Sequence, residues 1–197
     1  MNKLFSDQYL KKQINRGVGR NLVRKQYFDN ILKHIDGSTI DLGCGAGNLL
    51  ESLPHSSIGL EVNLKAVEFC KKKGLNVIHF DPEVDQYQFK SLRKGQFKYL
   101  TMLHVLEHID TPELVVRKIL LSCQRLGIKK VFCVVPGLKG FKSDSTHKVM
   151  ITKSFFEKFE LLKVGEFEIC DQSFYPFNFS WVGNIFAHNE FIVRYER

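Results

Sequence analysis

The chain has 197 residues, of which 44% are hydrophobic and 25% charged, and its formal net charge is +8. This length and apolar content predict a single domain with a sizeable core. No apolar run approaches the roughly 18 residues of a membrane span, and the first residues lack the apolar centre of a signal peptide. We therefore expect a cytoplasmic protein. The five cysteines form no C-x-x-C pair, which argues against a zinc site and a disulfide framework.

Basic residues gather in the first part of the chain. Residues 1–34 carry eight lysines or arginines and two aspartates, a net charge of +6, from Lys3, Lys11, Lys12, Arg16, Arg20, Arg24, Lys25 and Lys33 against Asp7 and Asp29. Apolar residues recur at helical spacing over 20–35, which predicts an amphipathic helix. We interpret the charge as a solvated helix face. Attraction of an anionic partner, such as a phosphorylated sugar, a lipid head group or RNA, is the alternative.

The stretch 38–50, STIDLGCGAGNLL, predicts a strand, a tight turn and the start of a helix. Gly43, Gly45 and Gly47 lack Cβ atoms, so the backbone of this turn can lie against a ligand. Asp41 stands just before the turn, where a carboxylate suits an ammonium or sulfonium group and would repel a pyrophosphate. The dinucleotide pattern G-x-G-x-x-G also fits poorly, because Asn48 occupies the place of its third glycine.

Two further acidic residues end predicted strands. Glu61 closes a strand over 57–61, where nucleotide-binding βαβ units place the carboxylate that accepts hydrogen bonds from ribose hydroxyls. Asp81, followed by Pro82, closes a strand over 76–80. It either accepts a hydrogen bond from an exocyclic amine or caps the next turn. Because acids end three successive strands, we interpret them as parts of one site.

The segment after the fourth predicted strand, 97–103, reads HVLEHIDTPE. His104, Glu107 and His108 form H-x-x-E-H, a pattern of inverted zinc proteases. We reject a protease because a new helix begins near Pro112, so no single long helix carries both histidines. The sequence also shows no third protein ligand, and no metal is assigned.

In order and spacing, DLGCGAGN, Glu61, Asp81 and LHVLEH resemble the class I S-adenosylmethionine-dependent methyltransferases over about residues 35–135. The resemblance implies an α/β, doubly wound, Rossmann-like and mostly parallel sheet of seven strands, with an antiparallel last strand and helices on both faces. It implies that S-adenosylmethionine, with S-adenosylhomocysteine as product, lies between the first and fourth strands. The cofactor-binding residues that it implies are Asp41, Gly43, Gly45, Gly47, Glu61, Val62, Asp81, Pro82 and Leu103.

The same resemblance bears on the substrate side. It implies that the side chain of His108 faces the methyl acceptor. Some quinone-pathway relatives hold a divalent cation with E-x-x-E-H at this place, whereas this chain has His104 in place of the first glutamate.

The rest of the chain predicts a helix over 112–126, a buried strand over 129–136, a helix over 152–159, and strands over 161–169 and 190–195. The polar loop 137–150 contains His147, which either acts as a base or substrate contact or only ties the loop down. Aromatic residues crowd the region between the last two strands. We expect them to fill the core at the sheet edge, with an acceptor pocket as the alternative: Phe174, Tyr175, Phe177, Phe179 and Trp181.

We expect one domain, 1–197, with a basic helical segment over 1–36, a cofactor-binding core over 37–136, and substrate-side loops and antiparallel strands over 137–197. The expected reaction is transfer of a methyl group from S-adenosylmethionine to a small molecule, such as a saccharide, a lipid-linked intermediate or a quinone-like hydroxyl. An oxygen acceptor needs its proton removed, by His108 as first choice and His147 as second.

Two other functions remain open on the sequence. An NAD(P)-dependent oxidoreductase shares the βαβ logic, although Asn48 and Asp41 stand against it. The second alternative is a non-catalytic module of the same fold that binds RNA or a partner through the basic N-terminus. No RNA-reading motif is visible, so nucleic acid is not expected as a partner.

Overall fold

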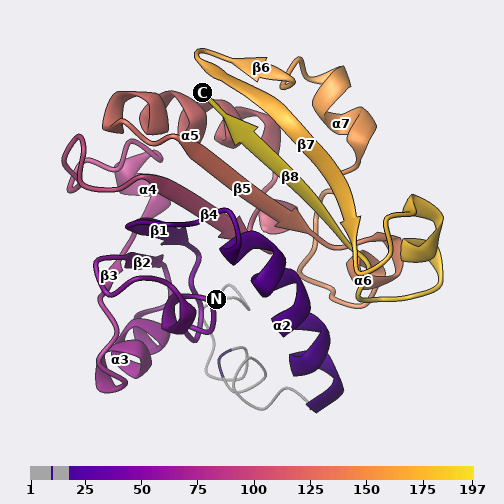
Figure 1. Cartoon of the computed structure of the whole chain (residues 1–197), viewed down its shortest axis with the longest axis horizontal. Helices are drawn as coiled ribbons and strands as arrows, with labels where there is room; N and C mark the ends of the chain where they lie inside the picture. The colour runs from indigo at the N-terminus through magenta and orange to yellow at the C-terminus, as the bar shows by residue number, and fades with distance from the viewer. Residues whose placement is uncertain (1–9, 11–17) are drawn as a thin grey trace.

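The structure is a computed structural model that describes residue 10 and residues 18–197. Figure 1 shows the chain as a single sheet with helices packed around it. The helices are α2 Val18–Leu32, η2 Leu50–Ser52, α3 Leu64–Lys72, α4 Pro82–Asp85, η3 Leu106–His108, α5 Pro112–Leu126, α6 Leu138–Lys142, α7 Lys153–Lys158 and η4 Ser180–Asn184. The strands are β1 Thr39–Leu42, β2 Ile58–Glu61, β3 Val77–His79, β4 Tyr99–Leu103, β5 Lys130–Val135, β6 Lys163–Val164, β7 Phe167–Tyr175 and β8 Glu190–Glu196.

The sheet has the order β3-β2-β1-β4-β5-β8-β7-β6. Strands β1 to β5 are parallel, and β8 is antiparallel to both β5 and β7. Strand order reverses between β1 and β4, which makes the sheet doubly wound and places the ligand-binding crevice beside these two strands. The predicted fold class is confirmed. The described residues form eight strands because the predicted strand 161–169 turns at Gly165, which leaves the two-residue β6 paired with β7.

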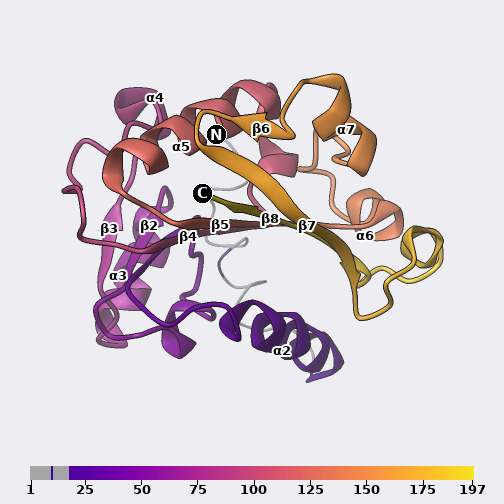
Figure 2. The ribbon, with the colours of Figure 1, turned by 45° about the horizontal axis from the view of Figure 1, so that its top comes forward.

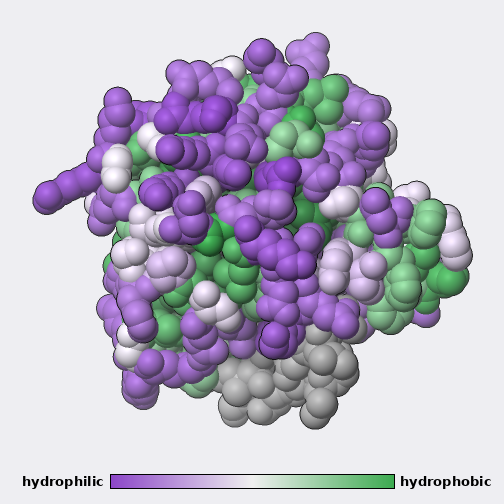
Figure 3. Space-filling view, viewed as in Figure 1, coloured by the Kyte–Doolittle hydropathy of each residue, from purple (hydrophilic) through white to green (hydrophobic). Residues whose placement is uncertain are grey.

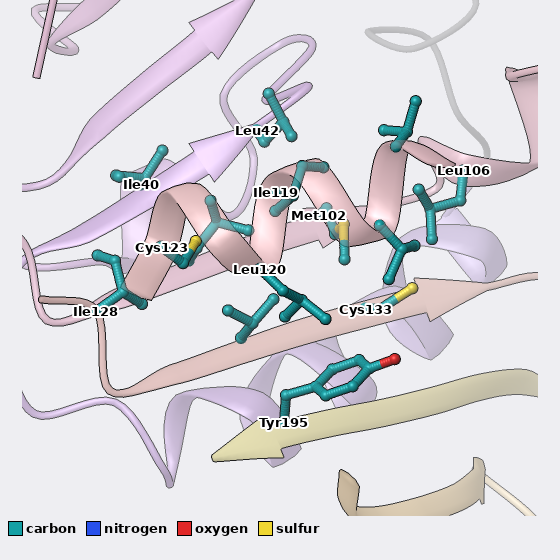
Figure 4. Close-up of a cluster of buried hydrophobic side chains, with 14 of the residues drawn as sticks. Ile40, Leu42, Met102, Leu106, Ile119, Leu120, Cys123, Ile128, Cys133 and Tyr195 are labelled. Carbon is teal, nitrogen blue, oxygen red and sulfur yellow. The ribbon is translucent and has the colours of Figure 1, made fainter. Parts of the chain in front are cut away.

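The two faces of the sheet carry separate parts of the core. On β5, Val131, Cys133 and Val135 pack into the large cluster under α5, whereas Phe132 and Val134 pack with Tyr27 and Ile31 of α2 on the opposite face. Figure 2 shows α2 and α3 on one side of the sheet and α4, α5 and α7 on the other. Figure 4 shows the cluster under α5, where side chains of α5, β4 and β5 meet Tyr195 of β8. Strand β5 is therefore buried on both faces, as its near-continuous apolar sequence predicts.

The predicted helix after the glycine turn is shorter than expected. Turns lead from Gly43 into η2, a single 3-10 turn, and Pro54 follows almost at once. Since proline cannot continue a helix, too few residues remain for a regular α-helix at this place. The cofactor-side wall is therefore a set of turns rather than a long helix.

Helix α2 confirms the predicted N-terminal helix and its amphipathic character. Tyr27 and Ile31 are buried against the sheet, while Lys25 and Asp29 form an exposed ion pair on the outer face. The helix is therefore solvated on one side only. The four basic residues that precede α2 lie outside the described residues: Lys3, Lys11, Lys12 and Arg16. Within the described part of the chain, no helix has the length and apolarity needed to span a membrane.

The aromatic residues near the C-terminus are where the core prediction is wrong. Phe179 is 62% exposed and Trp181 is 60% exposed, and Phe177 is exposed as well. Residues 177–189 loop outward beyond β7 and β8 and pack on α6, where Asn189 bonds the backbone of Phe177 and Phe179. Figure 3 shows a hydrophobic lobe at this edge of the molecule. Phe174 and Tyr175 keep the predicted role: Phe174 stacks on Phe191, and each of the two packs against a cluster of the core.

Candidate functional site

A cavity of about 250 Å³ opens beside the carboxyl ends of β1, β2 and β4. Most of the predicted site residues line this cavity: Asp41, Gly43, Gly45, Glu61, Val62, Pro82, Leu103 and His108. Three predicted residues, Gly47, Asp81 and His147, are outside the lining that the described residues form. Most of the predicted side chains therefore lie in the crevice that the strand order predicts.

All three glycines of the turn have positive φ, and at Gly43 and Gly47 an added Cβ would also collide with a neighbouring side chain. Gly43 has φ +72°, and a Cβ added there would lie 2.6 Å from Cγ2 of Val105. Gly47 has φ +77° and faces Leu75 and Cys70 of the α3 side, where a Cβ would collide with Leu75. Both positions are in the left-handed region that favours glycine. Gly43 therefore keeps the backbone bare at the cavity, and Gly47 allows the turn to pack on α3.

Asp41 is buried at the inner wall of the cavity. Its Oδ1 accepts a hydrogen bond of 2.8 Å from the Thr101 hydroxyl on the neighbouring strand. Burial, with a smaller contribution from the nearby carboxylate of Glu61, raises the pKa of Asp41 to about 7, while the hydrogen bond from Thr101 opposes the shift. A carboxyl group in this state gains most from a cationic ligand, which would favour its ionised form.

Glu61 joins the glycine turn to the start of α3. Its Oε2 accepts a hydrogen bond of 2.7 Å from the Gly45 amide, and its Oε1 accepts one of 2.8 Å from the Asn63 amide. Burial raises the pKa of Glu61, against the effect of these amides. A carboxylate has about four acceptor positions, so two bonds leave capacity for ligand hydroxyl groups. Glu61 is both a brace for the turn and a candidate ligand contact.

Asp81 adopts the capping role that the sequence left open. It is exposed, and its Oδ1 accepts from the amides of Glu83 and Val84 at the start of α4. Pro82, the first residue of α4, lines the cavity in its place. A contact between Asp81 and a ligand amine remains a prediction.

The chain shares a family with known proteins. The family model described as "Methionine biosynthesis protein MetW" matches residues 25–142, more than half of the chain. The chain belongs to the MetW family. The matched range begins within α2 and ends with α6, and it includes every residue that lines the cavity except Arg24.

Other matches of this MetW-family chain extend the comparison. A ubiquinone biosynthesis O-methyltransferase of Escherichia coli strain K12 is 29% identical over 85 residues, which cover 40% of this chain and 35% of that protein. The chain thus spans about a third of the length of the curated relatives that it matches.

Solved structures share the fold over nearly the whole chain. A SAM-dependent methyltransferase from Archaeoglobus fulgidus has a TM-score of 0.65 at 21% identity and covers 98% of this chain and 100% of its own. A magnesium protoporphyrin IX methyltransferase from Synechocystis, solved with bound SAH, has a TM-score of 0.68 at 12% identity and covers 100% of this chain and 97% of its own. The predicted resemblance of the fold to that of class I methyltransferases is confirmed.

The two histidines that the sequence predicts as catalytic in this MetW-family chain, His108 and His147, lie side by side at the cavity. His108 lines it, and the His147 ring lies 4.8 Å from the His108 ring, centroid to centroid. Nδ1 of His147 lies 2.8 Å from the Phe141 carbonyl oxygen, and its ring stacks on Phe141. Burial lowers the pKa of His108, although the charge of Glu107 opposes this. The loop that carries His147 is thus tied down and also placed beside His108.

Several lining residues escaped the sequence reasoning. Arg24, Tyr27 and Phe28 of α2 form one wall, and the Tyr27 hydroxyl lies 3.4 Å from Nε2 of His104. His104 itself has φ +57°, an unusual conformation for a residue other than glycine, and its Nδ1 lies 3.1 Å from Glu107. The apolar stripe of α2 indicated which side of the helix is buried, but no local signal showed that this side meets the cavity.

Proposed function

We propose that this MetW-family protein is an S-adenosylmethionine-dependent methyltransferase that acts on a small molecule. One observation carries the proposal: the buried carboxyls of Asp41 and Glu61 flank the bare backbone of Gly43 and Gly45 on one wall of a single cavity. A positively charged ligand with hydroxyl groups fits this wall, because the two acids complement charge and accept hydrogen bonds. A pyrophosphate fits it poorly, since both acids would repel it.

When bound, S-adenosylmethionine would supply a methyl group on a positively charged sulfur. Asp41 would complement the ligand's positive charge, and its pKa near 7 would fall on binding. Glu61 would accept hydrogen bonds from the ribose hydroxyls, while the amides of Gly45 and Asn63 keep its carboxylate in place. Gly43 and Gly45 would let the backbone approach the ligand closely.

The acceptor side of the cavity supports a small molecule with an oxygen nucleophile. His108 faces this end with His147 beside it, and an imidazole can accept the proton that a hydroxyl must lose. Arg24, which lines the cavity from α2, favours an acceptor with an anionic group. A saccharide, a lipid-linked intermediate and a quinone-like hydroxyl all fit this description, and the last matches the name of the O-methyltransferase relative.

Calorimetric titration with S-adenosylhomocysteine tests the cofactor half of the proposal, with NADH as the comparison ligand. We expect wild-type protein to bind S-adenosylhomocysteine, and Glu61→Gln to weaken binding by about 10-fold or more through lost hydrogen bonds to a charged group. The exposed Glu68 on α3 offers a matched control, Glu68→Gln, which should leave affinity unchanged. Binding of NADH in preference to S-adenosylhomocysteine would overturn the proposal.

A methyl-transfer screen with radiolabelled S-adenosylmethionine tests the acceptor half. Pools of sugars, quinone precursors, small amines and RNA separate the acceptor classes, and we expect label in a small molecule that carries a hydroxyl group. With that acceptor, His108→Ala should lower kcat by about 100-fold, the usual size of a proton-transfer contribution, with a much smaller change in cofactor Kd. His55→Ala, at an exposed position outside the cavity lining, is the control. Full turnover by His108→Ala would remove that residue from the mechanism.

A further inference from the structure

A cluster of three potential metal ligands lies at the outer end of the cavity. Glu107 and His108 come from η3, and His147 comes from the loop after α6. One ligand-capable atom from each lies within 4.8 Å of the others. The loop is held against η3 because the amides of Lys148 and Val149 both donate to the Glu107 carbonyl oxygen. The sequence showed no third ligand beside HVLEH, and the fold provides one from a distant segment.

Glu107 is the unusual member of this cluster. Its side chain is only 1% exposed. Its Oε1 lies 3.1 Å from His104 Nδ1 and 3.9 Å from His147 Nε2, whereas its Oε2 has no hydrogen-bond partner among the described residues. A buried carboxylate oxygen without a partner loses its hydration and gains nothing in return. A cation bound beside this oxygen would compensate for the lost hydration.

The two histidines are oriented by their backbone neighbours. Nδ1 of His108 lies near both the carbonyl oxygen and the hydroxyl oxygen of Thr146. The carbonyl can only accept, and the hydroxyl already donates to Asp144, so Nδ1 of His108 is the donor. Nδ1 of His147 likewise donates to the Phe141 carbonyl oxygen. In the neutral form, each ring therefore has its lone pair on Nε2. A backbone acceptor that fixes the tautomer in this way is the usual outer partner of a metal-binding histidine.

We propose that Glu107, His108 and His147 bind a divalent transition-metal ion at the acceptor end of the cavity. Two imidazoles and one carboxylate suit Zn²⁺, Fe²⁺ or Co²⁺ better than Mg²⁺ or Ca²⁺, which prefer oxygen ligands alone. Ligands about 2.1 Å from a common ion lie roughly 3.4 Å apart, so the cluster closes on an ion by a small movement of its side chains. Three protein ligands also leave a coordination position open.

This inference rests on the proposed methyltransferase function and narrows its acceptor. His108 lines the cavity, so the open coordination position faces the space where the acceptor would enter. The acceptor class is then a molecule that offers an oxygen ligand, such as a phenol, a diol or a hydroxy acid. A metal-bound hydroxyl loses its proton more readily than a free one. In the metal-loaded protein, His108 would hold the ion instead of accepting the proton. The ion would lower the pKa of the bound hydroxyl, and the proton would leave to water.

Cobalt and zinc provide the test without any need for the acceptor. We expect chelator-treated wild-type protein to bind one equivalent of Co²⁺ with the visible absorption of a protein-bound site, and one equivalent of Zn²⁺ by calorimetry. Glu107→Gln and His147→Gln should each weaken binding by at least 10-fold to 100-fold. Two controls should bind as wild type does: His55→Gln and, because Cys170 is an exposed thiol, Cys170→Ser. Binding that is absent in wild type, or that Glu107→Gln leaves unchanged, would refute the site.

Thermal unfolding and S-adenosylhomocysteine titration complete the experiment. Zn²⁺ should raise the Tm of wild type and of both controls but not the Tm of Glu107→Gln. If Glu107→Gln does not fold, His147→Gln replaces it, and Zn²⁺ should likewise fail to raise the Tm of that variant. S-adenosylhomocysteine bound by protein that takes up no metal would refute only the metal site. Metal uptake without S-adenosylhomocysteine binding would refute the methyltransferase proposal and leave the metal site standing.

Discussion

The titration of Asp41 is a prediction that the fold makes before any ligand is known. Its pKa is about 7 in the folded protein, against an ordinary value of 3.8. Between these two values the folded protein binds a proton that the unfolded chain has released, so stability falls as pH rises through this window. A difference of about 3 pH units corresponds to about 4 kcal/mol in total. Between pH 5 and pH 8 the loss amounts to about 2.5 kcal/mol.

Urea unfolding of wild type and Asp41→Asn from pH 5 to pH 8 measures this loss. Asparagine keeps an oxygen that accepts from Thr101 but does not titrate. The free energy of unfolding of Asp41→Asn, relative to wild type, should therefore rise by about 2.5 kcal/mol across this range. Glu68→Gln, at an exposed position, should show a constant offset. A constant offset for Asp41→Asn as well would mean that the Asp41 carboxyl is not held protonated by its burial.

The same group links pH to ligand binding. S-adenosylhomocysteine lacks the sulfonium charge but keeps an α-ammonium group. If that group lies beside Asp41 it favours the ionised carboxylate, so the affinity of wild type for this ligand should rise from pH 5 to pH 8. The rise should be at most about 10-fold per pH unit below pH 7. Asp41→Asn should lack this dependence. Calorimetric Kd values at three pH values test whether Asp41 causes this pH dependence. Equal pH profiles for wild type and Asp41→Asn would show that it does not.

Two further predictions concern stability. Gly43→Ala should destabilise the fold by about 2 kcal/mol, because alanine is strained at φ +72° and its Cβ would meet Val105. Adding Val105→Ala should cost less than the sum of the two single changes in urea unfolding, and simple additivity would count against the contact. Tyr195→Phe should cost about 1–2 kcal/mol, since the buried Tyr195 hydroxyl donates to the Leu161 carbonyl oxygen at 2.8 Å. A Tm equal to that of wild type would contradict this value.

The first half of the fold was predictable because its signals are local. Glycine at positive φ, an acid at a strand end and alternating apolar residues each depend on a few neighbours in the chain. Gly43 and Gly47 show this, as both occupy the left-handed region that the spacing of the turn suggested. Strand β5 shows it too, because its unbroken apolar run indicates burial on two faces.

Other features depended on contacts between segments far apart in the sequence. The sequence does indicate that Pro54 ends the helix after the glycine turn, and the structure has only the short η2 there. The exposure of Phe179 and Trp181 could not be found in the same way. Their composition suits a core, and only the excursion of residues 177–189 beyond the sheet edge leaves them in solvent.

By itself, the amino-acid sequence determined the doubly wound sheet, the family resemblance and the acids around the glycine turn. The tertiary structure alone decided that Tyr27 and Arg24 wall the cavity, and that His147 lies beside His108 and the buried Glu107. The physical reason is the range of each interaction. Backbone conformation and strand patterning are set by adjacent residues, whereas a cavity and a ligand cluster exist only where distant segments pack together.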